Sequence, residues 1–159
     1  MTLPLSLEFS YIKRTLQFRF EAGTSRGVML TRVVYWIKVH RKGDLDRLGW
    51  GEAAPLPGLS PDFGSDFEAQ LSGVLKQATA RAWDLEEESL LQQVKVLVPF
   101  SLPSIRFGLE TALLDFLNGG RKRILANTFF DQGRPIPING LIWMGTKEFM
   151  LQQINQKLG

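Results

Sequence analysis

The stretch at residues 49–60, which reads GWGEAAPLPGLS, constrains the fold more than any other part of the chain. Large and small residues alternate in its first half, as they do in a β-strand with one packed face. Pro55 and Pro57 then each remove a backbone donor and fix φ, and Gly58 admits conformations with positive φ. The sequence therefore predicts a strand that ends abruptly and continues as a stiff, partly apolar loop. Such a loop is a common place for ligand contact, although an ordinary turn between a sheet and a helix is the simpler interpretation.

The first six residues of this stretch also match the dinucleotide-binding pattern GxGxxG/A. That motif needs a helix that opens directly behind it, so that the helix N-terminus can face the pyrophosphate. Here the residues PLPG follow in place of a helix. The sequence therefore predicts no nucleotide site.

Composition and charge exclude several other classes of protein. The chain has no cysteine, which excludes disulfides, zinc–thiolate sites and a thiol nucleophile. His40 is the only histidine, so a metal site rich in nitrogen ligands is not expected. The 19 basic residues exceed the 16 acidic residues by too little to indicate nucleic acid or a membrane as a partner. No apolar run approaches the ~20 residues that span a bilayer, and we expect a soluble, cytoplasmic protein.

The first third of the chain has the period of two residues that is typical of strands. Apolar residues alternate with other residues at 5–20, at 28–40 and at 48–53, and residues 21–27 have the composition of a loop. Because the connections are short, we expect these segments to form an antiparallel meander of three strands.

After the loop the period changes to the 3.6 residues of helices with one apolar face. The residues SDFE at 65–68 form a capping-box pattern, which predicts the start of a helix that reaches about Ala82. A second helix is predicted from Asp84 to Pro99, and a third from Pro103 to the glycines that follow Asn118. Strands followed by helices indicate an α+β layer arrangement.

The C-terminal part has a different pattern. Residues 138–145 are apolar on both faces, which is typical of a buried parallel strand, and Thr146 is placed to cap a last helix. Parallel strands occur in sheets that are covered by helices, not singly. We therefore expect the sequence to stop at an element boundary of a larger fold.

Three segments resemble, in this order, the N-terminal half of the o-succinylbenzoate synthase family. They are GWGEAAPLPG at 49–58, PSIRFGLETA at 103–112 and NGLI at 139–142. That family belongs to the muconate-lactonizing subgroup of the enolase superfamily. The likeness covers essentially the whole chain, and the APLPG loop is its main support within the subgroup.

The resemblance implies two parts: an enolase-like capping domain at residues 1–120, and a connector with the first strand and helix of an incomplete TIM-type barrel at 121–159. A complete barrel typically needs ~250 residues. In the family, catalysis uses a Lys-x-Lys pair on the second barrel strand and carboxylate ligands for Mg²⁺ on later strands. None of those positions lies in this chain, so we expect no catalytic residue, no metal ligand and no bound Mg²⁺ here.

The activity implied for the complete enzyme is that of a Mg²⁺-dependent lyase. It would dehydrate 2-succinyl-6-hydroxy-2,4-cyclohexadiene-1-carboxylate, a small carboxylate, to o-succinylbenzoate in menaquinone biosynthesis, and the 159-residue chain alone is expected to be inactive. Two alternatives stay open: a fragment of a dipeptide or N-acylamino acid epimerase of the same superfamily, or a free-standing binding module without catalysis. A fragment would expose apolar surface that favours self-association.

The resemblance also implies which residues face the substrate. In the family, two loops of the capping domain fold over the mouth of the barrel, and they correspond to residues 22–26 and 55–60. Leu56 and Leu59 would then wall off water, and Arg26 would pair with a carboxylate of the substrate. Ile142 and Met144 share one side of the predicted barrel strand and would point inward. The alternatives are a solvated arginine for Arg26 and simple core filling for Ile142 and Met144.

Overall fold

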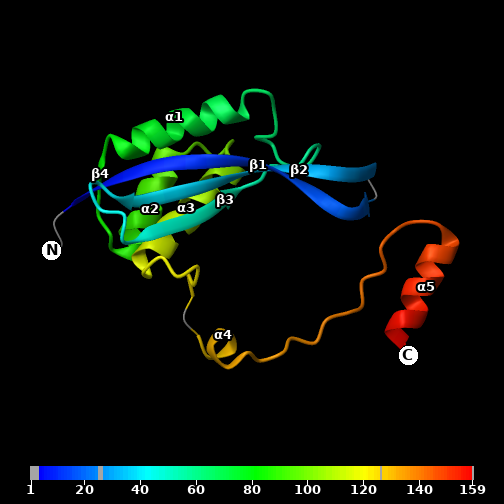
Figure 1. Ribbon diagram of the computed structural model, residues 1–159. Coiled ribbons are helices and arrows are strands. Elements are labelled where there is room, and N and C mark those ends of the chain that lie inside the picture. Colours follow the sequence, from blue (N-terminus) through cyan, green and yellow to red (C-terminus); the bar gives the residue numbers. More distant parts are fainter. Residues whose placement is uncertain (1–3, 25–26, 126, 159) are drawn as a thin grey trace. The chain divides into compact units, whose positions relative to one another are not determined.

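The computed structural model describes residues 4–24, 27–125 and 127–158 (Figure 1). In chain order its elements are β1 (Leu5–Thr24), β2 (Gly27–Arg41), β3 (Leu48–Ala53), α1 (Phe67–Thr79), β4 (Ala82–Trp83), α2 (Glu87–Leu97), α3 (Pro103–Leu117), α4 (Thr128–Gln132) and α5 (Lys147–Leu158). The long strands precede the helices, as the change of period from two to 3.6 residues predicted.

The chain divides into two compact units. The first unit comprises residues 1–14 and 33–125, and the second comprises residues 15–32 and 126–159. The far halves of β1 and β2 thus belong to the same unit as the C-terminal helices. The domain boundary at residue 120 stays a prediction.

The strands form an antiparallel sheet in the order β3–β2–β1–β4. The predicted meander is confirmed, and β2 pairs with β3 from Tyr35 opposite Ala53 to His40 opposite Leu48. Two details differ from the prediction. Most of the expected loop at 21–27 is strand, because β1 continues to Thr24 and β2 begins at Gly27. The short strand β4, which the helical pattern had absorbed, pairs with the start of β1.

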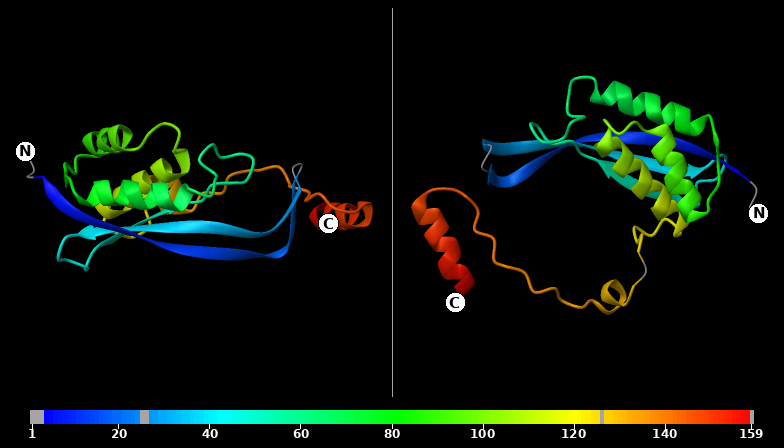
Figure 2. Two further views of the ribbon diagram at one scale, coloured as in Figure 1. Left: turned by 90° about the horizontal axis from the view of Figure 1, so that it is seen from above. Right: turned by 180° about the vertical axis from the view of Figure 1, so that it is seen from behind.

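Helices α1, α2 and α3 cover one face of the sheet, as the two views of Figure 2 show. Tyr35, Ile37 and Val39, which share one face of β2, all lie in the hydrophobic core. The helices contribute the apolar stripes that their periodicity predicted. Fully buried members of this core include Leu71, Ala78, Leu90, Val94, Ile105, Leu109, Ala112 and Leu113.

Strand β3 and helix α3 approach each other closely because glycines line their contact. A Cβ added to Gly51 would overlap the carbonyl oxygen of Gly108 and would lie 2.6 Å from the hydroxyl of Thr111. A Cβ added to Gly108 would lie 2.9 Å from the backbone nitrogen of Ala53. The small residues in GWGEAA therefore allow the close packing of helix against strand.

The expected capping box at the start of α1 does not form. Asp66 is the N-cap of α1 and makes no capping hydrogen bond with its side chain. Glu68, the other half of the predicted box, accepts hydrogen bonds from the hydroxyl of Tyr11 at 3.0 Å and from Nζ of Lys13 at 2.5 Å. The carboxylate is engaged by two donors from β1, so it does not turn back to the helix start.

Glu68 is expected to make the stability of the protein sensitive to acid. The hydrogen bond from Lys13, with that from Tyr11, lowers the pKa of Glu68 below its ordinary value of 4.5. The carboxylate therefore stabilises the folded state above pH 4.5, and this contribution is lost as the pH falls through the lower folded-state pKa. We expect the melting temperature, measured by calorimetry, to fall as the pH is lowered from 4.5. In Glu68→Gln this fall in melting temperature should be smaller. Superimposable acid profiles of the two proteins would contradict this role.

The strand predicted at residues 138–145 is wrong, whereas the helix behind it is confirmed as α5. Residues 138–144 belong to no strand or helix. The backbone nitrogen of Trp143 donates to Oε1 of Gln153 at 2.9 Å, and Nε2 of Gln153 donates to the carbonyl of Trp143 at 3.1 Å. A strand needs a neighbouring strand. Here the backbone groups of Trp143 bond instead to the side-chain amide of Gln153 on α5.

Candidate functional site

The proline-rich loop after β3 is a closed, hydrogen-bonded turn. The backbone nitrogens of Leu59 and Ser60 both donate to the carbonyl of Leu56, at 3.2 and 3.0 Å. The hydroxyl of Ser60 accepts from the backbone nitrogen of Leu56 at 2.9 Å. Gly58 has a φ of +69°, a conformation that glycine adopts without strain. The prediction of a stiff loop is thus supported by its own hydrogen bonds, not only by its prolines.

Asp62 anchors this loop to the start of α3. Its Oδ2 accepts from the backbone nitrogen of Ser104 at 2.7 Å, and its Oδ1 accepts from the hydroxyl of Ser104 at 2.8 Å. The N-cap residue of α3, Leu102, has no capping side chain of its own. A buried carboxylate 42 residues away therefore satisfies amides at the helix start. The sequence predicted a helix that begins at Pro103 but did not indicate the contact with Asp62.

Two of the predicted substrate-facing residues lie together on the closed turn, in the first unit. Leu56 is half-buried, whereas Leu59 is 57% exposed. The neighbouring Phe63 is 52% exposed, so the loop presents apolar side chains to its surroundings. Exposed apolar side chains on a rigid turn are typical of a surface that covers a partner or ligand.

The other predicted substrate-facing residues belong to the second unit. Ile142 is half-buried and Met144 is exposed, on the extended segment before α5. Between them, the ring of Trp143 meets the ring of Phe20 edge-on, with centroids 5.8 Å apart. The ring of Trp143 thus contacts a side chain of β1. Arg26 lies outside the described residues.

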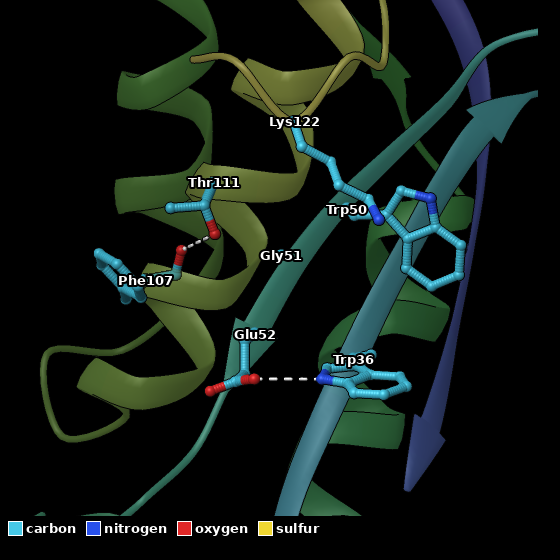
Figure 3. A pocket seen from close by; sticks show the side chains of 7 residues that line it. All are labelled: Trp36, Trp50, Gly51, Glu52, Phe107, Thr111 and Lys122. Atoms are coloured by element: carbon cyan, nitrogen blue, oxygen red, sulfur yellow. Dashed lines mark hydrogen bonds between the residues drawn. The ribbon is translucent and has the colours of Figure 1, made fainter. Parts of the chain in front are cut away.

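A second concave surface lies on the first unit, where β2, β3 and α3 meet (Figure 3). It encloses about 460 Å³, a size within the range of small-molecule sites. Within it, Nε1 of Trp36 donates a hydrogen bond of 3.1 Å to Oε2 of Glu52, its neighbour on the paired strand. Its lining residues are Trp36, Trp50, Gly51, Glu52, Phe107, Thr111 and Lys122. Sequence reasoning did not predict this pocket.

A fully buried carboxylate holds two walls of this pocket in place. Oδ2 of Asp115 accepts from the backbone nitrogen of Trp50 at 2.9 Å, and Oδ1 accepts from the backbone nitrogen of Lys122 at 2.6 Å. Asp115 comes from α3, Trp50 from β3, and Lys122 from the turn that follows α3. One side chain thereby joins β3 to the end of α3 and the turn after it, 65 residues further along the chain.

The part of the chain that the structure describes holds no group of three or more metal-ligating side chains that could bind a metal ion. Within the same residues, no helix is both long and apolar enough to cross a membrane. The described residues present exposed apolar side chains at the loop and an aromatic, charged pocket at β3.

Comparison with known proteins identifies similar chains, although no family model matches. The chain is 32% identical over 173 residues to an o-succinylbenzoate synthase of Desulfotalea psychrophila, and the match covers 96% of this chain and 46% of the relative. The crystal structure of MenC from Desulfotalea psychrophila LSv54 matches with a TM-score of 0.70 at 28% identity, again covering 96% of this chain and 46% of that one. The chain thus spans about half the length of the curated relative.

A more distant structure shares the fold alone. An enolase family member from Agrobacterium tumefaciens with homology to dipeptide epimerases matches with a TM-score of 0.65 at 16% identity, over 94% of this chain and 42% of that one. The two matches to Desulfotalea psychrophila confirm the resemblance to the o-succinylbenzoate synthase family. They also confirm the fold class expected for the N-terminal part of an enolase-superfamily protein.

Proposed function

We propose that the chain is the N-terminal part of an o-succinylbenzoate synthase-like lyase and that it supplies the lid over the substrate. The observation that carries this proposal is the 32% identity to an o-succinylbenzoate synthase over 96% of the chain. The complete enzyme would dehydrate 2-succinyl-6-hydroxy-2,4-cyclohexadiene-1-carboxylate to o-succinylbenzoate, a step of menaquinone biosynthesis in the cytoplasm. The chain by itself would be inactive.

The loop at residues 55–60 supports the assignment of a lid. Its turn is closed by its own hydrogen bonds, and Asp62 fixes it to α3. A preorganised loop holds its apolar side chains in place without an ordering cost at each binding event. Leu56 and Leu59 are proposed to exclude water and to contact the apolar ring of the substrate.

Three further residues are proposed for the same site. Ile142 and Met144 would line the inner side of the first barrel strand once neighbouring strands pair with it. Arg26 would pair with a carboxylate of the substrate, because a guanidinium matches the two oxygens of a carboxylate. Each of these assignments depends on the resemblance and is open to direct mutational test.

Magnesium is the cofactor proposed for the complete enzyme, where it would stabilise the negative charge that develops when a proton is removed next to a carboxylate. Hard cations of this kind prefer carboxylate oxygens, and the described residues contain no cluster of such groups. The residues present therefore do not fit the ion. Its ligands would come from barrel strands that are not among the 159 residues of this chain.

An epimerase of the same superfamily is the second candidate, because the neighbour from Agrobacterium tumefaciens has homology to dipeptide epimerases. At 16% identity that neighbour supports the fold and not the substrate. The two candidates are separated by assaying the complete protein on both substrate types. Dehydration without epimerisation supports the lyase, and epimerisation of a dipeptide without dehydration would replace it.

The lid role predicts a specific effect of Leu59. We expect Leu59→Asp, made in the chain joined to the C-terminal half of the Desulfotalea psychrophila enzyme, to lower kcat/KM by about tenfold, since one lost apolar contact costs roughly that much. Leu45→Asp is the matched control, because Leu45 is 66% exposed on the turn between β2 and β3. An equal loss of activity in the two variants, or none in Leu59→Asp, would remove the loop from the substrate site.

A further inference from the structure

We propose that the pocket between β3 and α3 binds a small zwitterion whose ammonium and carboxylate lie at opposite ends of a flat apolar body. This inference goes beyond the lyase function and concerns a different surface from the loop at residues 55–60. It depends on the placement of Glu52, Lys122 and two tryptophans, all within the first unit.

The pocket has the shape and walls of a small-molecule site. Its volume of about 460 Å³ suits a single aromatic ring with short substituents. Trp50 and Trp36 provide flat apolar surface in this pocket. Phe107 and Thr111 of α3 form the opposite wall (Figure 3). Aromatic walls of this kind favour a ligand with a flat ring.

The carboxylate end of the pocket is oriented before any ligand arrives. Oε2 of Glu52 accepts the indole hydrogen of Trp36 at 3.1 Å. The guanidinium of Arg14 lies over the ring of the same tryptophan, 5.7 Å from its centroid. Trp36 therefore contacts both Glu52 and Arg14, and its hydrogen bond orients the Glu52 carboxylate. The second oxygen of Glu52 remains an acceptor for a cationic group of the ligand.

The ammonium end is positioned by the buried side chain of Asp115. It binds the backbone nitrogens of both Trp50 and Lys122, so the Lys122 chain leaves the backbone close to Trp50. Glu52 comes from β3 and bonds to Trp36. Figure 3 shows Lys122 beside Trp50 and Glu52 beside Trp36, so the two opposite charges lie at different sides of the pocket.

Only a ligand with both charges matches this arrangement. A simple amine would be attracted by Glu52 and repelled by Lys122, and a simple carboxylate would be repelled by Glu52. A zwitterion with separated ends pairs its ammonium with Glu52 and its carboxylate with Lys122, while its ring lies against Trp50. The predicted ligand class is therefore an aromatic amino acid in which the two groups are para to each other or similarly distant.

The test is a calorimetric titration of the chain with 4-(aminomethyl)benzoate, and with benzylamine and 4-methylbenzoate as compounds that carry one charge each. We expect the zwitterion to bind at least fivefold more tightly than either of them. Glu52→Gln should lower the affinity for the zwitterion and for benzylamine by about fivefold, as expected for the loss of one exposed ion pair. The affinity for 4-methylbenzoate should stay the same or rise. Lys122→Gln should instead lower the affinity for the zwitterion and for 4-methylbenzoate.

Matched control variants are Glu88→Gln and Lys95→Gln, exposed residues of α2 that lie outside this pocket. They should leave all three affinities unchanged. Circular dichroism spectra that superimpose would show that the four variants are folded. The proposal is overturned if the zwitterion does not bind, if the singly charged compounds bind as tightly, or if Glu52→Gln leaves its affinity unchanged.

Discussion

Replacing Gly51 with valine is expected to lower the free energy of unfolding by about 3 kcal/mol, near the upper end for overpacking. The first added carbon would overlap the carbonyl oxygen of Gly108 and would lie 2.7 Å from the backbone nitrogen of Ala112. Both obstacles are backbone atoms of a buried helix, so no flexible side chain can move aside. Urea denaturation of the two proteins measures the difference.

The control for this prediction is Gly73→Ala in α1. An added Cβ at Gly73 meets nothing within 4 Å, and alanine is preferred over glycine in a helix interior by up to about 1 kcal/mol. We therefore expect the control variant to be as stable as the parent or more so. If Gly51→Val were as stable as Gly73→Ala, strand β3 and helix α3 would not be packed backbone to backbone.

The second large effect is expected at Asp115. Asp115→Ala would leave the backbone nitrogens of Trp50 and Lys122 without their acceptor in a buried place. Because a hydrogen bond to a charged group contributes about 1.5–3 kcal/mol, we expect a loss of about 4 kcal/mol. Urea denaturation measures the loss, and hydrogen exchange at these two amides should become faster at the same time.

Asp115→Asn separates the hydrogen bonds from the shape of the side chain. Asparagine keeps the volume and one acceptor oxygen, so it should recover about half of the stability lost in the alanine variant. Full recovery of the stability in Asp115→Asn would mean that packing, not the two hydrogen bonds, is the contribution of Asp115. A loss below about 1 kcal/mol in Asp115→Ala would contradict its role in joining β3 to the turn after α3.

The sequence predicted those parts of the fold that local periodicity determines. The alternation in residues 28–40 placed Tyr35, Ile37 and Val39 on one face of a strand, and all three lie in the core. The stripe that contains Leu71 and Leu75 likewise predicted the buried face of α1. In both cases the pattern repeats over several turns or pairs of residues, so single exceptions do not obscure it.

The errors occurred where a distant residue decides the outcome. Asp62 acts on α3 from 42 residues away and Asp115 on β3 from 65 residues away, and no local pattern indicates either contact. The capping box failed because Glu68 found donors on β1. The strand predicted at residues 138–145 failed for a related reason, since apolar composition alone does not supply a neighbouring strand.

The candidate site divides in the same way. The prolines and Gly58 are local signals, and they predicted a stiff loop whose hydrogen bonds the structure then supplied. The pocket at β3 needed three segments to come together, and its charged residues Glu52 and Lys122 are 70 positions apart in number. Only the folded chain shows that Asp115 joins the segments that carry them.

The central claim is that this chain is a lid that needs a catalytic half. Its most direct test joins the chain to the C-terminal half of the Desulfotalea psychrophila o-succinylbenzoate synthase and measures dehydration beside the chain alone. We predict product from the joined protein, loss of that product with a metal chelator, and none from the folded chain alone. Dehydration by the chain alone in the presence of chelator would contradict the account, as would a folded, joined protein that epimerises dipeptides but does not dehydrate.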